Sequence, residues 1–88
     1  MKESDARWCV YALRCSNDHI YVGSTNNLTR RLEEHRKGMG SKFVRAHLPF
    51  ELVRVIACRD RHEARTTEHR LKQMRREKKL VALGLRQD

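Results

Sequence analysis

The chain has 88 residues, which is enough for one compact domain and too few for two. Its 20 Lys and Arg against 11 Asp and Glu give a net charge of +9, so we expect nucleic acid, the commonest polyanion, as its partner. We expect no membrane partner. No apolar run approaches the roughly 20 residues of a transmembrane helix, and the basic C-terminal stretch lacks the apolar face and aromatic anchors of a peripheral helix.

The first elements along the chain are predicted to be the two strands of a β-hairpin. Residues 8–13 and 20–24 are rich in aromatic and β-branched side chains, and residues 15–19 have the composition of a turn. Side chains alternate with a period of two, so an even loop would place Tyr11 and Tyr21 on opposite faces of the sheet. If both phenols serve one site, the loop needs an odd number of residues or a bulge.

A helix and a third strand should follow. The Thr-Asn-Asn segment at 25–27 offers N-caps for a helix over about 28–37, and Gly38 is its predicted stop. Residues 39–49 form a basic connection with two glycines and the only proline. Residues 50–58 carry Leu, Val and Ile on both alternating faces, which predicts a strand covered on both sides.

The C-terminal third is predicted to be helical. Asp60 is followed three residues later by Glu63, as in a capping box, and this helix should run to about residue 74 or 75. A shorter helical piece should end at Gly84. The order strand, strand, helix, strand, helix predicts an α+β fold, with a small, mainly antiparallel three-stranded sheet flanked by helices. We expect a single domain over residues 1–88, with its core at about residues 7–84.

The N-terminus and the cysteines indicate the compartment. Residues 1–5 do not resemble a signal peptide, so we expect a cytoplasmic protein, associated with the nucleoid, or nuclear in a eukaryote. Cys9, Cys15 and Cys58 are odd in number and form no Cys-x-x-Cys pair, which indicates neither a disulfide framework nor a standard zinc site. We interpret them as small, mostly buried apolar side chains.

Two basic side chains lie on the face of the first helix that should meet the sheet. At about 100° per residue, Leu28, Arg31, Leu32 and His35 share this face. Two interpretations are open. Arg31 could extend its charged end to solvent while His35 is a structural histidine, or both could belong to a site.

Glu68 is the corresponding anomaly on the last long helix, where Ala64, Thr67 and Leu71 form the apolar stripe. A carboxylate that faces a core is costly unless it is paired or bound to a metal. Glu68 is therefore either the structural ion-pair partner of Arg31 or a metal ligand.

Tyr11 and Tyr21 add phenols to this set, although tyrosines in small sheets are ordinarily packing residues. A carboxylate for a hard cation, an arginine able to hold a phosphate through two parallel hydrogen bonds, phenols and a basic surface together meet the needs of phosphodiester hydrolysis. The chain contains no phosphate-binding Gly-rich loop, nucleophile elbow or His-Glu-x-x-His helix that would indicate a competing site.

At these residues the chain resembles the GIY-YIG endonuclease superfamily, and most of all its small stand-alone members. Cys9-Val10-Tyr11 stands in the place of the first motif and Tyr21-Val22-Gly23 in that of the second. The segment from Gly23 to His35 resembles the strand-to-helix part of the family, and Glu68 resembles its late metal-binding Glu. The resemblance covers about residues 8–80. Its motif positions are Gly23, Thr25, Arg31, His35 and Glu68.

The resemblance implies the α+β fold above and one divalent metal, Mg²⁺ or Mn²⁺, held by Glu68, with a nucleophile derived from water. It implies these roles: Tyr11 accepts a proton, Tyr21 orients water or phosphate, Arg31 steadies the phosphate and His35 assists. Because the ordinary pKa of tyrosine is about 10, Tyr11 is a poor base unless the metal and Arg31 lower its pKa.

Three departures from the family pattern are visible. Cys9 replaces the first Gly, Val replaces Ile in both motifs, and no Asn follows Asn27, whereas many members carry a late active-site Asn. The Val changes are conservative in a strand. The first Gly supplies no chemical group to the mechanism.

The function expected from all of this is a Mg²⁺-dependent endonuclease of low sequence specificity, acting on DNA in repair or processing and attracted to branched, damaged or single-stranded substrates. A protein partner could supply specificity. The alternatives are a non-catalytic nucleic-acid-binding module of the same fold and a structural adaptor whose charge keeps it soluble. The basic residues expected to contact nucleic acid are Arg30, Lys42, Arg45, Lys72, Arg75, Arg76, Lys78 and Lys79.

Overall fold

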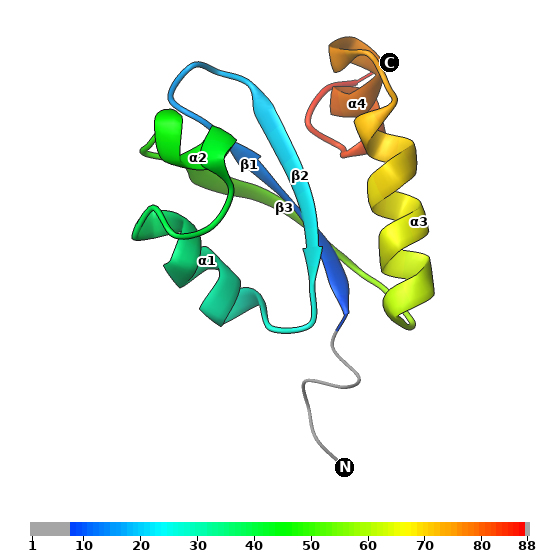
Figure 1. Ribbon diagram of the computed structural model, residues 1–88. Coiled ribbons are helices and arrows are strands. Elements are labelled where there is room, and N and C mark those ends of the chain that lie inside the picture. Colours follow the sequence, from blue (N-terminus) through cyan, green and yellow to red (C-terminus); the bar gives the residue numbers. More distant parts are fainter. Residues whose placement is uncertain (1–7, 88) are drawn as a thin grey trace.

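The computed structural model describes residues 8–87, so the predicted start of the core at Arg7 and the first five residues lie outside the described part. The fold is α+β, as predicted from the sequence (Figure 1). Its three strands form one sheet in the order β2-β1-β3, and both strand pairs are antiparallel. The elements are β1 (Cys9–Arg14), β2 (Ile20–Thr25), α1 (Leu28–Arg36), α2 (Lys42–Ala46), β3 (Glu51–Ala57), α3 (Arg61–Lys72) and α4 (Arg76–Ala82).

The loop between β1 and β2 has an odd number of residues, as it must if the two tyrosines are to lie on one face of the sheet. Five residues, 15–19, connect the strands, and Tyr11 lies opposite Gly23 while Leu13 lies opposite Tyr21. Tyr11 and Leu13 are two positions apart and share a face of the sheet, so Tyr21 shares that face as well. The centroids of the two tyrosine rings are 6.4 Å apart.

The helices cover opposite faces of this sheet, with α1 and α2 on one side and α3 and α4 on the other (Figure 1). Alternation along β1 supplies both cores, and β1 is buried along nearly its whole length. The α1/α2 side is built on Tyr11, Leu13, Cys15, Leu32 and Val44. The α3/α4 side is built on Val10, Ala12, Val22, Ala64, Leu71 and Leu83.

The prediction that the third strand is covered on both sides was wrong. β3 is an edge strand beside β1, and Leu52 and Val55 are 37% and 41% exposed. Leu52 pairs with Leu13 and Val55 with Tyr11, so both lie on the α1/α2 side of the sheet, and these helices leave that side of β3 partly open. With only three strands in the sheet, β3 has no partner on its outer side among the described residues.

The connection predicted for residues 39–49 contains a short helix, α2. Ser41 caps it, because its Oγ accepts hydrogen bonds from the backbone N–H of Phe43 and Val44. Gly38 follows the end of α1 with a φ of 77°, as expected of a helix stop.

The last two helices follow the prediction with shifted ends. Asp60 caps α3, which ends at Lys72, two or three residues earlier than expected, and the shorter helical piece is α4. Gly84 follows α4 with a φ of 74°. Within residues 8–87, no helix combines the length and the apolar character that crossing a membrane demands.

Candidate active site

A polar cleft of about 360 Å³ lies over the edge strand β2, between α1 and α3. Among residues 8–87 no strand lies on the outer side of β2, so side chains from both faces of the sheet reach around its edge and meet there. Tyr11 and Tyr21 come from the α1/α2 face and Glu68 comes from the α3 face. The predicted residues that line the cleft are Tyr11, Tyr21, Gly23, Thr25, Arg30, Arg31 and Glu68.

Tyr11 reaches the cleft by lying across Gly23, its partner in the register. A Cβ at position 23 would lie 2.5 Å from Tyr11 Oη and 2.6 Å from Cζ, closer than any side-chain contact allows. Gly23 is therefore required by the phenol that crosses it. Tyr11 is only 1% exposed, so its ring packs in the core and its hydroxyl borders the cleft.

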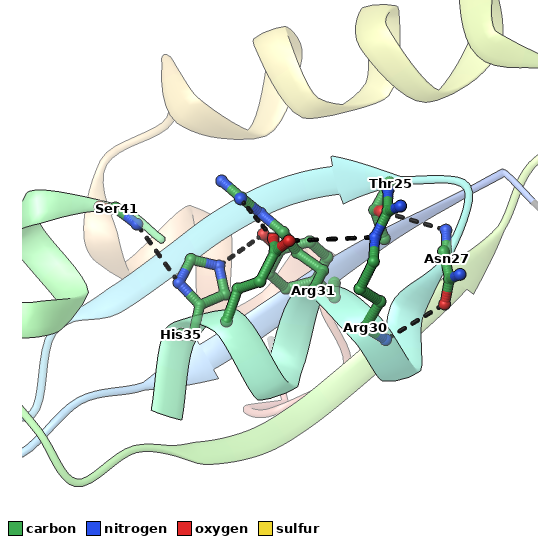
Figure 2. Close-up of polar contacts among 8 residues, drawn as sticks. Thr25, Asn27, Arg30, Arg31, His35 and Ser41 are labelled. Carbon is green, nitrogen blue, oxygen red and sulfur yellow. Dashed lines mark hydrogen bonds and ion pairs between the residues drawn. The ribbon is translucent and has the colours of Figure 1, made fainter. Parts of the chain in front are cut away.

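His35 lies behind Tyr11 and is fully buried. Its Nδ1 accepts a hydrogen bond of 3.4 Å from the backbone N–H of Ser41, so Nε2 carries the ring proton and donates it to Tyr11 Oη, 2.8 Å away. Figure 2 shows the imidazole beside the backbone nitrogen of Ser41. A Cβ at Gly40 would collide with Nδ1, so glycine is needed there as well. His35 thus positions Tyr11 and does not itself line the cleft.

The ionisation of this pair follows from its surroundings. Burial, together with the charge of Arg31, lowers the pKa of His35, which favours the neutral imidazole. Burial raises the pKa of Tyr11 to about 12, although a hydrogen bond with Arg31 acts in the opposite direction. Tyr11 is therefore a neutral phenol near pH 7, and it can accept a proton only when a further positive charge lowers its pKa.

Arg31 is held at the cleft by Glu34, one turn further along α1. Arg31 Nη1 donates a 3.0 Å hydrogen bond to Glu34 Oε1, and Arg30 Nε lies 3.9 Å from the other carboxylate oxygen. Both arginines extend from the same end of α1 (Figure 2). Asn27 is the N-cap of this helix, and its Oδ1 accepts a hydrogen bond from the backbone N–H of Arg30. The cap therefore fixes the backbone of the helical turn that carries both guanidinium groups.

Glu68 faces the cleft from α3, and its partners differ from the ion pair considered from the sequence. Ser24 Oγ donates a 2.5 Å hydrogen bond to Oε1, and Lys72 Nζ lies 2.7 Å from Oε2. Arg31 pairs with Glu34 instead. Burial alone would raise the pKa of Glu68, but the hydrogen bonds from Lys72 and Ser24 outweigh it and lower the pKa. Glu68 is an ionised carboxylate with 18% of its side chain exposed.

The donor set fits one hard cation bound jointly with a phosphate. Within residues 8–87, no three His, Cys, Asp or Glu side chains gather closely enough to hold a metal alone. Mg²⁺ commonly binds through one or two carboxylates, with water and substrate phosphate completing its shell. Glu68 can provide such a carboxylate.

Sequence reasoning missed five residues that line the cleft: Trp8, Ser24, Asn26, Glu34 and Arg65. Two of them had a signal. Glu34 is three residues from Arg31 on one helix, which is the spacing of an ion pair. Ser24 alternates with Gly23 and so points to the opposite face, toward Glu68.

Most of the other basic residues expected to contact nucleic acid lie outside the cleft lining. Lys42 and Arg45 are exposed on α2, Arg75 and Lys78 are exposed at α4, and Lys79 is half-buried there. Arg76 holds α4 to the hairpin loop, donating a 2.7 Å hydrogen bond to the backbone oxygen of Asp18 and pairing with its carboxylate at 3.1 Å. Lys72 belongs to the site through Glu68.

The model of the GIY-YIG catalytic domain matches residues 7–80 of this chain. The chain belongs to the GIY-YIG family. This match extends over both strands of the hairpin, α1 and α3, and so includes every residue of the cleft. GIY-YIG domains are those of a nuclease family, whose members generally use divalent metal ions and act on nucleic acid.

Relatives of this GIY-YIG chain carry the name UPF0213. It is 38% identical over 82 residues to a UPF0213 protein of Nitratidesulfovibrio vulgaris, covering 93% of this chain and 74% of the relative. It is 42% identical over 76 residues to one of Oceanobacillus iheyensis, covering 86% and 88%. The solution NMR structure of a UPF0213 protein from Bacillus halodurans is similar with a TM-score of 0.61 and 34% identity, covering 91% of this chain and 85% of that one.

Proposed function

We propose that this GIY-YIG protein is a single-domain, Mg²⁺- or Mn²⁺-dependent endonuclease that hydrolyses phosphodiester bonds, in DNA first of all, with low sequence specificity. The observation that carries the proposal is the meeting of three groups in one cleft: the ionised carboxylate of Glu68, the guanidinium of Arg31 and the buried phenol of Tyr11. A role in DNA repair or processing, a cytoplasmic location and a protein partner that adds specificity belong to the same proposal.

Glu68 would hold the cation at the edge of β2. When bound, the cation supplies charge neutralisation for the phosphate and an acidified water. Arg31, already oriented by Glu34, grips a phosphate oxygen through its remaining N–H groups. Tyr21 orients water or phosphate from the neighbouring strand.

Tyr11 would accept the proton of the attacking water. Its pKa is about 12 even beside Arg31, so it needs a further positive charge nearby before it can act as a base. The N–H of His35 Nε2 supports the phenolate by donating to Oη. Burial of both rings excludes water from that side, so the hydroxyl is reached from the cleft.

The second candidate is a module of the same fold that binds nucleic acid without turnover. It is favoured by the high pKa of Tyr11 and by the lack of any Asn after Asn27. In either case we expect the phosphate backbone to be contacted by Arg30, Lys42, Arg45, Lys72, Arg75, Arg76, Lys78 and Lys79.

Cleavage of a panel of duplex, single-stranded, flap and junction substrates with Mg²⁺ or Mn²⁺ tests the proposal. Glu68→Gln keeps the shape of the side chain and removes its charge, so we expect cleavage to fall by at least about 100-fold. Its half-exposed pair with Lys72 is worth at most about 1 kcal/mol, so the thermal midpoint should change little. Glu77→Gln, an exposed carboxylate on α4, is the control with the same change of charge.

Two outcomes would contradict the proposal. Binding of the substrates without cleavage of any of them would favour the second candidate. Equal cleavage by wild type and Glu68→Gln would remove Glu68 from the mechanism.

A further inference from the structure

A row of aromatic rings leads away from the cleft across the hairpin and α2. Phe43, in the first turn of α2, lies beside Tyr21 with ring centroids 6.3 Å apart and an interplanar angle of 15°. It lies beside His19 at 6.0 Å and 9°, and beside His47 at 4.7 Å and 54°. Three rings, those of His19, Phe43 and Tyr21, are thus nearly parallel. Tyr21 connects this row to the cleft that it lines.

Phe43 keeps 38% of its surface exposed despite these neighbours. The other large apolar side chains exposed to this degree in residues 8–87 are Met39, Leu52 and Val55, of which the last two lie on β3 at the opposite edge of the sheet. Phe43 is the aromatic member of this group, and its ring lies beside that of Tyr21, which lines the cleft. An exposed ring beside a residue of a polar cleft has the character of a stacking platform.

Positive charge lies near several rings of the row. Lys42 precedes Phe43 on α2 and is exposed, and Lys72 Nζ lies 5.8 Å from the centroid of the Tyr21 ring. Arg76 lies at the hairpin loop through its bonds to Asp18, next to His19. Aromatic faces interleaved with lysine and arginine are what proteins offer to single-stranded nucleic acid, where bases stack and phosphates are neutralised.

We propose that Phe43 stacks on an unpaired base of a nucleic-acid strand whose adjacent phosphate lies in the cleft, so that the site selects substrates with an unpaired nucleotide at the scissile bond. The inference rests on the proposed function for the identity of the ligand as nucleic acid. Bases inside an intact duplex have both faces stacked on their neighbours. Only an extruded or single-stranded base can present a face to Phe43.

A purely structural role for Phe43 makes a different prediction. In that case its ring serves only to pack α2 against Tyr21 and His19, and an apolar side chain of similar size would replace it. Phe43→Leu keeps apolar volume and removes the π-face, whereas Phe43→Trp keeps and enlarges it. The two variants therefore separate packing from stacking, and thermal midpoints of both show whether the fold is retained.

The experiment measures binding in EDTA, so that no cleavage occurs, by fluorescence anisotropy. The probes are a single-stranded oligonucleotide, a blunt duplex of the same sequence, and the single strand with one 2-aminopurine. We expect Phe43→Leu to weaken binding of the single strand by about tenfold, the cost of one lost stacked base, and to leave duplex binding unchanged. Phe43→Trp should bind the single strand at least as tightly as wild type. Val55→Ala, which shortens an exposed side chain on β3, should change neither affinity.

The 2-aminopurine strand reports stacking directly, because its fluorescence is quenched on an aromatic face. Wild type and Phe43→Trp should quench it, and Phe43→Leu should not. Equal affinity of wild type and Phe43→Leu for the single strand, or equal losses on single strand and duplex, would overturn the inference. Failure of the proposed function is a separate result. If the protein binds unpaired bases through Phe43 but cleaves nothing, the stacking role of Phe43 stands and only the endonuclease activity is disproved.

Discussion

The two faces of the sheet bury different kinds of side chain. Under α3 and α4 the buried cluster is apolar throughout, from Val10 and Ala12 on β1 to Leu83 after α4. Under α1 and α2 the buried groups include the phenol of Tyr11 and the imidazole of His35, hydrogen-bonded to each other. Alternate residues of the same strand serve both faces, so a very small domain can separate a core that stabilises from a core that carries reactive groups. Substitutions in the core under α3 and α4 should therefore reduce stability alone, whereas those in the core under α1 and α2 should affect the chemistry as well.

The largest expected effect on the free energy of unfolding comes from a substitution in the core under α3 and α4. Leu83 is fully buried there, and Leu83→Ala should lower the free energy of unfolding by about 2–5 kcal/mol, through lost burial and a residual cavity. Nucleic-acid binding and cleavage per folded molecule should be unchanged, because Leu83 does not line the cleft. Denaturant unfolding and assays at a temperature where the variant is folded check this.

Leu32→Ala is the matched substitution on the other face. Leu32 lies between Arg31 and His35 on α1 and is 8% exposed. Loss of its side chain should reduce both stability and cleavage. If Leu83→Ala impaired cleavage by the folded protein as much as Leu32→Ala, the separation of the two faces would be disproved.

The next substitution, at Gly23, should have a smaller effect on the free energy of unfolding and a larger effect on the rate of cleavage. Gly23→Ala places a methyl group 2.5 Å from Tyr11 Oη, so the ring must move, at a cost of about 1–3 kcal/mol for overpacking. Cleavage should fall by about 100-fold or more, since displacement of a reacting group by about 1 Å can have that effect. Thermal melting and cleavage rates measure the two losses.

Ser24→Ala is the neighbouring control for Gly23→Ala. It removes one hydrogen bond to Glu68 and adds no atom near Tyr11, so it should melt close to wild type. A Gly23→Ala protein with wild-type cleavage would show that the phenol need not lie across this strand.

Local patterns were sufficient for most of the fold. The hairpin, the capped helices and the α+β order follow from alternation, turn residues and the Asp60 cap, which act within a few residues. The exposure of β3 did not follow, because how far the helices extend over an apolar strand depends on tertiary packing. α2 was missed because five residues, capped by Ser41 and carrying Phe43, give too short a pattern to distinguish from a loop.

The sequence was enough to predict which residues belong to the candidate site, but not which partners their side chains contact. Arg31, His35 and Glu68 were conspicuous as polar residues on apolar helix faces, and all three lie at or behind the cleft. Their partners depend on distances across the fold. One of the two interpretations of Glu68 was an ion pair with Arg31, but each residue instead pairs with a residue one turn away on its own helix, Glu68 with Lys72 and Arg31 with Glu34.

His35, buried under α1 and α2, should make the free energy of unfolding depend on pH. Its pKa in the folded protein is lowered, so below the ordinary histidine value of about 6.5 the unfolded chain takes up the proton first. The stability that comes from keeping His35 neutral is therefore fully present at neutral pH. It is lost as the pH falls through about 6.5, and the free energy of unfolding decreases by at most about 1.4 kcal/mol per pH unit for this one proton. His35→Gln cannot titrate, so its unfolding free energy should fall less steeply between pH 7 and 5. Parallel slopes for the two proteins would contradict a buried neutral imidazole.

The smallest expected change in stability, and the most informative about the cation, is at Lys72. Its ammonium lies 2.7 Å from Glu68 Oε2, and with the side chain of Lys72 48% exposed this pair contributes at most about 1 kcal/mol. Lys72→Met removes a positive charge that repels a cation at the same carboxylate, and it also removes a bond that lowers the pKa of Glu68. Binding of Mn²⁺ to the protein saturated with a short single strand that it does not cleave, followed by calorimetry, should therefore tighten. Lys78→Met makes the same change of charge on α4, outside the cleft, and should leave Mn²⁺ affinity as in wild type. Equal gains in the two variants would mean that only the net charge of the domain matters, and weaker binding in Lys72→Met would show that the ammonium supports the cation site instead of competing with it.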